Sequence, residues 1–166
     1  MSGDALFPIV TSDDRNVMFV SARDGASTLW TVPLEGGQPV RFLDESALTF
    51  DLSADGKRLM IVSALANQVR VTVCELPSCT NRSRVTLLSN MGGLVRFSPS
   101  GRELAYVDVS GSNLWLQPLD GGPARSLTRF SDEKSVAYFD WSRDRSRLAV
   151  LRTTTSKDIV LLKGVK

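Results

Sequence analysis

Apolar residues occur along the chain in short runs of four to seven, separated by clusters of glycine, proline, asparagine, aspartate and serine. The runs are rich in β-branched and aromatic side chains, which is typical of strands. No 3.6-residue period of useful length is present, so we expect no long amphipathic helix. The pattern therefore predicts an all-β protein built from short antiparallel strands joined by tight turns.

Four segments of this pattern align with one another and define an internal repeat. The segments are VTSDDRNVMFVS (10–21), DLSADGKRLMIVS (51–63), RFSPSGRELAYVD (96–108) and DWSRDRSRLAVLR (140–152). The alignment makes four serines equivalent, at spacings of 41, 45 and 44 residues: Ser12, Ser53, Ser98 and Ser142. In the block that follows, a Leu-Trp pair and a Gly-Gly pair each recur after 85 residues. Repeats of this length are typical of propellers and solenoids.

Each repeat is predicted to form four strands, and the turn between the first two carries the clearest signal. Asp55-Gly56 is typical of a two-residue hairpin turn, in which both central residues adopt positive φ. The pairs Ser100-Gly101, Asp14-Arg15 and Asp144-Arg145 occupy the same place. Arginine at two glycine positions predicts either a different turn or a tolerated strain. A four-stranded antiparallel unit of this kind is one blade of a β-propeller.

The repeat divides a single domain, 1–166, into blades at about 6–43, 48–88, 94–128 and 138–166. The last blade stops after its third strand, which favours the C-terminal part of a larger propeller with six to eight blades in all. We expect two cut surfaces that expose blade faces and an unpaired strand edge. Such surfaces favour a homodimer formed through the open edges.

The blocks RFSPSGRELAYVD and NLWLQPLDGGPARSLT resemble the repeat of TolB-like propellers, which are also described as PD40 or WD40-like. The second unit departs most, with Pro77-Ser78-Cys79 where Gly-Gly is expected. The last unit resembles the final blade of propellers fused to bacterial serine/threonine kinases or winged-helix regulators. The resemblance implies a sensory or scaffold module that is extracytoplasmic, or periplasmic, in a bacterial cell. It names no ligand.

Composition and charge reduce the range of partners to be expected. The chain is 42% hydrophobic and 23% charged, an ordinary globular composition. A formal net charge of +2 gives no reason to expect a nucleic acid or a membrane surface as partner. No stretch of about 18 apolar residues is present, and residues 1–4 lack the features of a signal peptide. We therefore expect a protein or small-molecule partner and no direct membrane insertion.

The chain contains no histidine, which excludes Ser-His-Asp triads, Cys-His dyads, histidine-ligated zinc and histidine general bases within these residues. No kinase signature or nucleophile elbow is present either. We predict a non-enzymatic binding or sensory propeller without a cofactor. Two alternatives are the gating propeller of a prolyl-oligopeptidase-like hydrolase and an envelope scaffold like the TolB translocation protein.

Two repeated sets of side chains invite a functional interpretation but have a simpler structural one. The aspartates near each turn, with their serines, are better explained by turn hydrogen bonding than by metal binding, and no calcium-loop motif is present. We therefore predict no metal site. The aromatic residues recur at equivalent strand positions and are predicted to pack between blades rather than to form a stacking platform: Trp30, Trp115, Trp141, Phe50, Phe97, Phe139 and Tyr106.

Loops between the second and third strands of each blade gather on one face of a propeller, and such loops commonly carry binding residues. They supply our candidate site, with merely solvated turns as the alternative: Asp24, Asn67, Gln68, Ser112, Asn113, Thr154 and Thr155. Cys74 and Cys79 are the only cysteines, and four intervening residues allow a disulfide across the hairpin. One buried and one surface thiol in a reducing compartment is the alternative, and the sequence leaves both open.

Overall fold

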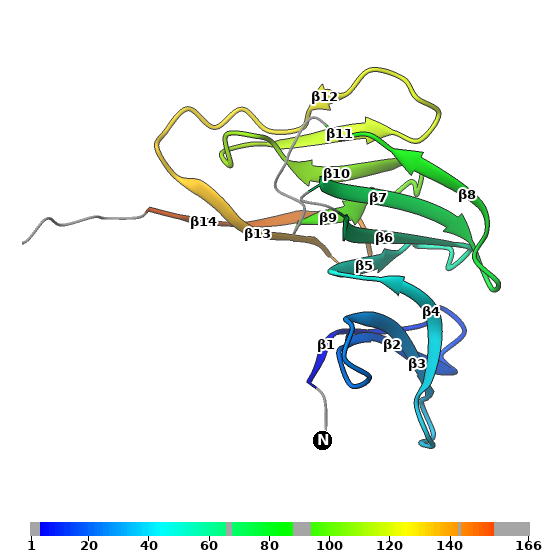
Figure 1. Cartoon of the computed structure of the whole chain (residues 1–166). Coiled ribbons are helices and arrows are strands. Elements are labelled where there is room, and N and C mark those ends of the chain that lie inside the picture. Colours follow the sequence, from blue (N-terminus) through cyan, green and yellow to red (C-terminus); the bar gives the residue numbers. More distant parts are fainter. Residues whose placement is uncertain (1–3, 66–67, 88–93, 143, 155–166) are drawn as a thin grey trace, which may run out of the picture.

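The computed structural model describes residues 4–65, 68–87, 94–142 and 144–154, and in these ranges it contains strands and turns but no α-helix (Figure 1). The first blade is the sheet β1-β2-β3-β4. Its strands are β1 (Ala5–Val10), β2 (Asn16–Ser21), β3 (Thr28–Pro33) and β4 (Val40–Ser46). The second blade, β5-β6-β7-β8, repeats this order. Its strands are β5 (Thr49–Leu52), β6 (Arg58–Leu65), β7 (Gln68–Glu75) and β8 (Thr80–Val85).

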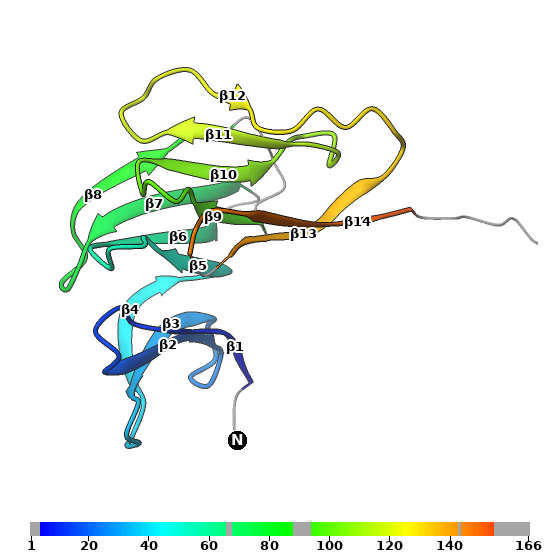
Figure 2. The same ribbon diagram turned by 180° about the vertical axis from the view of Figure 1, so that it is seen from behind.

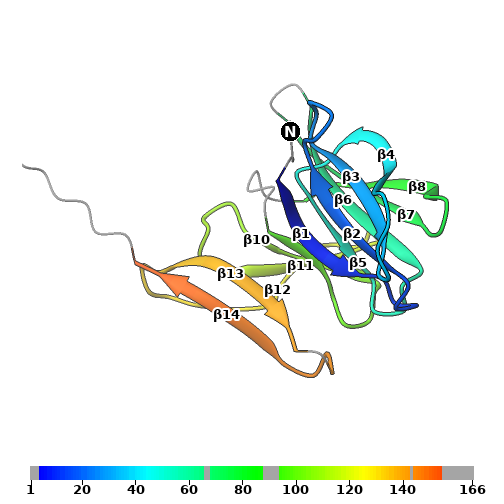
Figure 3. The ribbon, with the colours of Figure 1, turned by 90° about the horizontal axis from the view of Figure 1, so that it is seen from below.

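The third blade has the same topology, and the fourth contributes two described strands. The third contains β9 (Val95–Phe97), β10 (Glu103–Val107), β11 (Leu114–Pro118) and β12 (Arg125–Ser126). The fourth contains β13 (Ser135–Trp141) and β14 (Leu148–Thr153). The third strand expected for it, at 157–166, lies outside the described residues. The blades follow one another along an arc, with the first and fourth at its two ends (Figures 1 and 3), as the reverse view also shows (Figure 2). The prediction of an all-β propeller is confirmed.

Apolar side chains from facing sides of successive blades form three separate clusters. Between the first two blades, Met18 and Val20 of β2 meet Leu59 and Ile61 of β6. Met60 and Val62, which alternate with these on β6, face the third blade instead. A third cluster joins the third and fourth blades and includes Phe139. Since burying one such side chain contributes about 1.5–3 kcal/mol, these clusters hold the blades together in sequence order.

The aromatic residues mostly fill the space between blades, as predicted. Phe50, Phe97, Tyr106 and Phe139 are each at most 1% exposed. Trp30 is an exception, because it alternates with the core residue Leu29 and therefore faces away from the second blade.

Two arginines cover Trp30 in place of a neighbouring blade. The guanidinium carbons of Arg23 and Arg41 lie 4.8 and 5.3 Å from its ring centroid. Its indole N–H donates to the Thr28 hydroxyl at 3.0 Å. Trp30 is consequently only 6% exposed. The outer face of the first blade therefore does not present an open aromatic surface to solvent.

The turns between the first two strands of each blade share one geometry, which differs from the predicted two-residue turn. In the second blade, the Gly56 N–H donates to the Ser53 carbonyl at 2.8 Å and the Ser53 N–H to the Arg58 carbonyl at 3.0 Å. Gly56 has φ 66°, while Asp55 is not among the residues of positive φ. The turn is thus a four-residue loop in which only its third residue, Gly56, is left-handed.

The first blade shows that the aligned serine is displaced by one residue. Here the Asp14 N–H donates to the Thr11 carbonyl, and the Thr11 N–H to the Asn16 carbonyl. Thr11, not Ser12, is therefore the equivalent of Ser53, and the left-handed residue is Asp14, at φ 56°. In the fourth blade Arg145 adopts φ 59°. The first turn thus avoids a left-handed arginine, whereas the fourth tolerates one.

Candidate functional site

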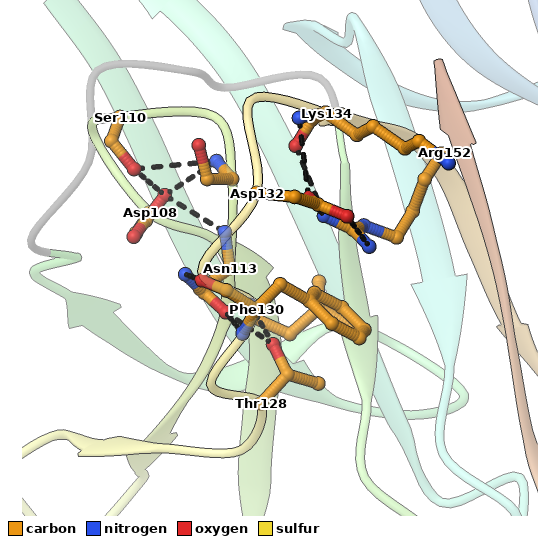
Figure 4. Close-up of polar contacts among 10 residues, drawn as sticks. Asp108, Ser110, Asn113, Thr128, Phe130, Asp132, Lys134 and Arg152 are labelled. Atoms are coloured by element: carbon orange, nitrogen blue, oxygen red, sulfur yellow. Dashed lines mark hydrogen bonds and ion pairs between the residues drawn. The ribbon is translucent and has the colours of Figure 1, made fainter. Parts of the chain in front are cut away.

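The predicted binding loop of the third blade is held by hydrogen bonds to its own side chains (Figure 4). Asp108 directly follows β10, and its Oδ1 accepts bonds from the backbone N–H groups of Ser112 and Asn113 at 3.0 and 3.2 Å. The Ser110 hydroxyl donates to the same oxygen at 2.8 Å. Gly111 closes the loop at φ 75°. The carboxylate thus organises the loop rather than facing a ligand.

Asn113 joins this loop to the segment that leads into the fourth blade. Its Oδ1 accepts bonds from the Phe130 N–H at 2.7 Å and the Thr128 hydroxyl at 3.0 Å. Its Nδ2 donates to the Phe130 carbonyl at 3.2 Å (Figure 4). With three of its hydrogen-bonding positions occupied by its own chain, Asn113 acts in this structure as a connector between blades.

Arg152 of β14 fixes the other end of the same segment (Figure 4). It forms an ion pair with Asp132 and donates to the Lys134 carbonyl at 3.3 Å. Its guanidinium carbon lies 3.8 Å from the Phe130 ring centroid. The hydrogen bond from Arg152 lowers the pKa of Asp132 below its usual value. The connection between the third and fourth blades is therefore anchored from both sides.

The remaining predicted residues are not brought together in the described parts of the chain. Asp24 is half-exposed and paired with Arg41. Thr154 is exposed after β14, and no hydrogen bond or ion pair in the described ranges joins it to Asp24 or Asn113. Asn67 and Thr155 lie outside the described residues, as does the side chain of Gln68.

A hollow of about 350 Å³ lies between the first and second blades, at the opposite ends of the strands from the predicted loops. The β1–β2 turn (11–15), Gly56 of the β5–β6 turn and the β7–β8 hairpin border it. Its floor is apolar and consists of Met18, Leu52, Phe42 and Leu76. A partly enclosed apolar pocket of this size is typical of small-ligand sites.

Polar groups surround the entrance of this interblade pocket. The Thr11 hydroxyl donates to the Asp13 carboxylate at 2.6 Å and so lowers the pKa of Asp13. Asn16, Thr31 and Lys57 also line the pocket. Their side chains have no hydrogen bond or ion pair within the described residues. These three groups are therefore available to a ligand, and sequence reasoning missed the pocket because it is created by packing between blades.

A disulfide between Cys74 and Cys79 fixes one wall of the pocket. Their Cα atoms are 4.9 Å apart, and both residues are buried. The enclosed segment includes Leu76 and Pro77, which line the pocket. Of the two states that the sequence left open, the structure contains the disulfide. Cys79 adopts φ 50°, a left-handed conformation at the place where glycine was expected.

Solved structures with the same architecture identify the fold. TolB from Acinetobacter baumannii matches with a TM-score of 0.70 and 18% identity, over 89% of this chain and 37% of its own. A putative TolB from Agrobacterium tumefaciens matches with a TM-score of 0.71 and 17% identity, over 87% and 52%. This chain has the fold of a TolB-like β-propeller.

The same fold also occurs in a protease. The β-propeller domain of the Trilobed protease from Pyrococcus furiosus matches with a TM-score of 0.56 and 17% identity, over 86% of this chain and 46% of that domain. The TolB-like chain thus spans about half, or less, of the length of each of these structures. Neither a known family model nor a curated protein sequence matches it.

The described part of this TolB-like propeller contains no group of three or more histidine, cysteine, aspartate or glutamate residues that could hold a metal ion. Within the same ranges, no helix is long and apolar enough to cross a membrane.

Proposed function

We propose that this TolB-like propeller is a non-catalytic recognition module that binds a protein or small ligand in the interblade pocket. The proposal is carried by an apolar floor combined with three polar side chains at the entrance, Asn16, Thr31 and Lys57, for which the described residues provide no hydrogen-bond or ion-pair partner. A few placed polar groups around an apolar cavity are what ligand recognition requires. The pocket lies between two blades joined by a buried apolar cluster, so its walls need little rearrangement on binding.

The state of the carboxylates supports a binding role over a catalytic one. Hydroxyl hydrogen bonds lower the pKa of Asp13, Asp55 and Asp144, so each is ionised near neutral pH and already engaged in its turn. Burial raises the pKa of Asp51, but its carboxylate accepts the Phe97 N–H at 2.7 Å in the interior. A general acid or base needs a pKa near the working pH and access to substrate, and none of these groups combines the two.

We further propose that the module acts outside the cytoplasm, as part of a larger bacterial protein linked to a kinase or regulator. The disulfide supports an oxidising compartment, since such bonds are rare in the cytosol. The kinase or regulator link rests on the resemblance of the last repeat.

A second candidate is a propeller that controls access to a hydrolase domain. The similarity to the propeller domain of the Trilobed protease supports this candidate. A scaffold role like that of TolB is a third candidate and rests on the similarity to the two TolB structures. In the scaffold case, binding would use the outer surface and would not depend on the interblade pocket.

Filling the pocket tests the proposal. Thr31→Phe places a ring in the hollow, whereas Val32→Phe, the control, alters the next residue of β3, on its other face. In a screen of peptides and metabolites, we expect some compounds to raise the melting temperature of the wild type. The same compounds should stabilise Val32→Phe but not Thr31→Phe. Binding that is retained in Thr31→Phe would mean that the ligand site is not the interblade pocket. Hydrolysis of esters or peptides by this chain would contradict the non-catalytic role.

A further inference from the structure

In the first three blades, the residue that begins the second strand lies on the side of that strand that faces the following blade. With the turns aligned on Thr11 and Ser53, Asn16 of β2 is equivalent to Arg58 of β6, and Glu103 is their counterpart in β10. Asn16 lines the interblade pocket between the first and second blades. The same position of the repeat is therefore occupied by asparagine in the first blade and by arginine in the second.

Between the second and third blades, Arg58 fills this location. Its Nη1 donates a hydrogen bond of 2.8 Å to the carbonyl of Gly101, the left-handed residue of the next turn. The contact is partly buried. A guanidinium thus connects one blade to the turn of the next.

Between the first and second blades no side chain takes the place of Arg58, although Ser12, which also lines the pocket, packs against Gly56. Asn16 is several bonds shorter than arginine, and the described residues supply no donor to the carbonyl of Gly56, the equivalent of Gly101. Both Asn16 and Gly56 line the pocket. The fold here has an acceptor and a cavity but lacks the side chain that uses them in the next blade.

We propose that the interblade pocket receives an arginine side chain from a peptide or protein partner, whose guanidinium donates to the Gly56 carbonyl as Arg58 donates to Gly101. The inference rests on the proposed function and specifies its ligand. Met18, Leu52 and Phe42 offer an apolar surface for the methylene stem. The Asn16 amide oxygen and the Thr31 hydroxyl are further acceptors for a guanidinium with five donors.

The charged groups at the entrance are Asp13 and Lys57. Asp13 is fixed by the Thr11 hydroxyl and the Arg15 N–H and supplies a negative charge to a cationic ligand. Lys57 is exposed and its ammonium has no partner in the described residues, so it can turn toward solvent when a cation binds. Acidic residues on the partner beside its arginine would pair with this lysine.

Short peptides of the form acetyl-Gly-X-Gly-amide, with X arginine, lysine or norleucine, test the inference on the wild-type chain. We expect the arginine peptide to bind at least about tenfold more tightly than the norleucine peptide, since it adds charge-assisted hydrogen bonds. Lysine should fall between them, because it carries the charge without the planar fork. Amide chemical shifts should change at Asn16, Gly56 and Thr31. Equal affinity for the three peptides, or shifts confined to another region, would overturn the inference.

Asn16→Arg supplies the missing side chain from the protein itself. We expect it to raise the melting temperature and abolish binding of the arginine peptide, whereas Val17→Arg, the control on the opposite face of β2, should leave binding unchanged. Retained binding in Asn16→Arg would contradict the inference, and if that variant fails to fold, the peptide series on the wild type still decides. Binding of a different ligand that Thr31→Phe blocks, with no arginine preference, would refute the arginine ligand but keep the proposed function. Failure of every ligand to bind in the pocket would refute both.

Discussion

In three of the four blades, a hydroxyl side chain at the start of the turn between the first two strands organises the residues that follow it. In the first blade the Thr11 Oγ1 accepts the Asn16 N–H at 3.0 Å and donates to Asp13. Ser53 and Ser142 make the same pair of contacts in their own blades. One hydroxyl thus positions both the turn carboxylate and the first residue of the next strand.

Replacing this hydroxyl therefore has a clear expected effect. Thr11→Ala should lower the free energy of unfolding by about 1 kcal/mol, because it leaves the Asn16 N–H without its partner. Ser12→Ala removes a hydroxyl for which the structure gives no hydrogen bond in the described residues, and should change stability by less than about 0.5 kcal/mol. Urea unfolding measures both variants. A larger loss of stability in Ser12→Ala than in Thr11→Ala would mean that Ser12 is the equivalent of Ser53, as the sequence alignment predicts.

Asp51 should respond to pH in the opposite sense to the turn aspartates. Burial raises its pKa above the usual 3.8, and the Phe97 N–H bond only partly offsets this. Because the folded state then binds the proton more tightly than the unfolded state, the stabilising contribution is present at low pH and is lost as pH rises through the raised value. Asp13, Asp55 and Asp144, with lowered pKa values, contribute above 3.8 and lose their contribution as pH falls below it.

Asp51→Asn keeps an acceptor for the Phe97 N–H but removes the charge. We expect the variant to gain stability relative to the wild type at pH 7, with a smaller gain at pH 4. Asp51→Ala, which removes the acceptor, should lose about 1–3 kcal/mol. Thermal unfolding across this range gives the comparison, and a gain for Asp51→Asn that grows toward pH 4 would reverse the assigned sign.

Among the connecting elements, the β7–β8 hairpin is closed by the disulfide and forms a wall of the pocket. The bond spans a sequence separation of 5. A loop this short reduces the entropy of the unfolded chain by an amount equivalent to about 2 kcal/mol. The hairpin therefore links the oxidation state of the protein to the shape of its pocket.

Removing the bond should affect stability and binding together. We expect the double substitution Cys74→Ser and Cys79→Ser to lower the free energy of unfolding by about 2 kcal/mol, or more because two hydroxyls are then buried. Treatment of the wild type with reductant gives the comparison without the buried hydroxyls. Denaturant midpoints with and without reductant measure the effect, and unchanged midpoints would mean that the bond adds no stability.

The elements differ in how far the sequence predicts them. The strands and turns follow from repeated apolar alternation, so their existence and order could be predicted. The register of the first turn could not be, because Thr11 and Ser12 carry the same hydroxyl and only the hydrogen bonds distinguish them. The predicted binding role of Asn113 illustrates a second limit, since its partner Phe130 bonds through backbone atoms that the residue type does not reveal. The pocket depends on Asn16 facing Gly56 across two blades, which follows only once the turn register is corrected.

On the scale of the whole molecule, the two ends of the arc differ. At the first blade, arginines cover Trp30, and Arg41 is in turn paired with Asp24 and Asp44. At the fourth blade, Leu151 alternates with Val150, which packs against the third cluster, and Leu151 itself is 58% exposed. Exposed apolar side chains at a sheet face are typical of association surfaces.

Self-association, if driven by this end, should depend on Leu151. We expect Leu151→Glu to shift the wild-type chain toward monomer in sedimentation velocity experiments over a concentration series. Val109→Glu is the matched control, because Val109 is 70% exposed but lies in the β10–β11 loop. A monomeric wild type at all concentrations, or equal effects of the two variants, would contradict association through the fourth blade.

Each of the three apolar clusters joins two neighbouring blades. The unfolding of one blade is therefore coupled directly to that of its neighbours only. The tryptophans lie at different points along the arc: Trp30 on the outer face of the first blade, Trp115 against the second cluster and Trp141 against the third. Chains that keep a single tryptophan would therefore report by fluorescence the melting of the first blade (Trp30), of the boundary between the second and third blades (Trp115) or of the boundary between the third and fourth (Trp141). Loosening that starts at an end of the arc would reach Trp30 or Trp141 before Trp115, which makes the order of fraying directly observable.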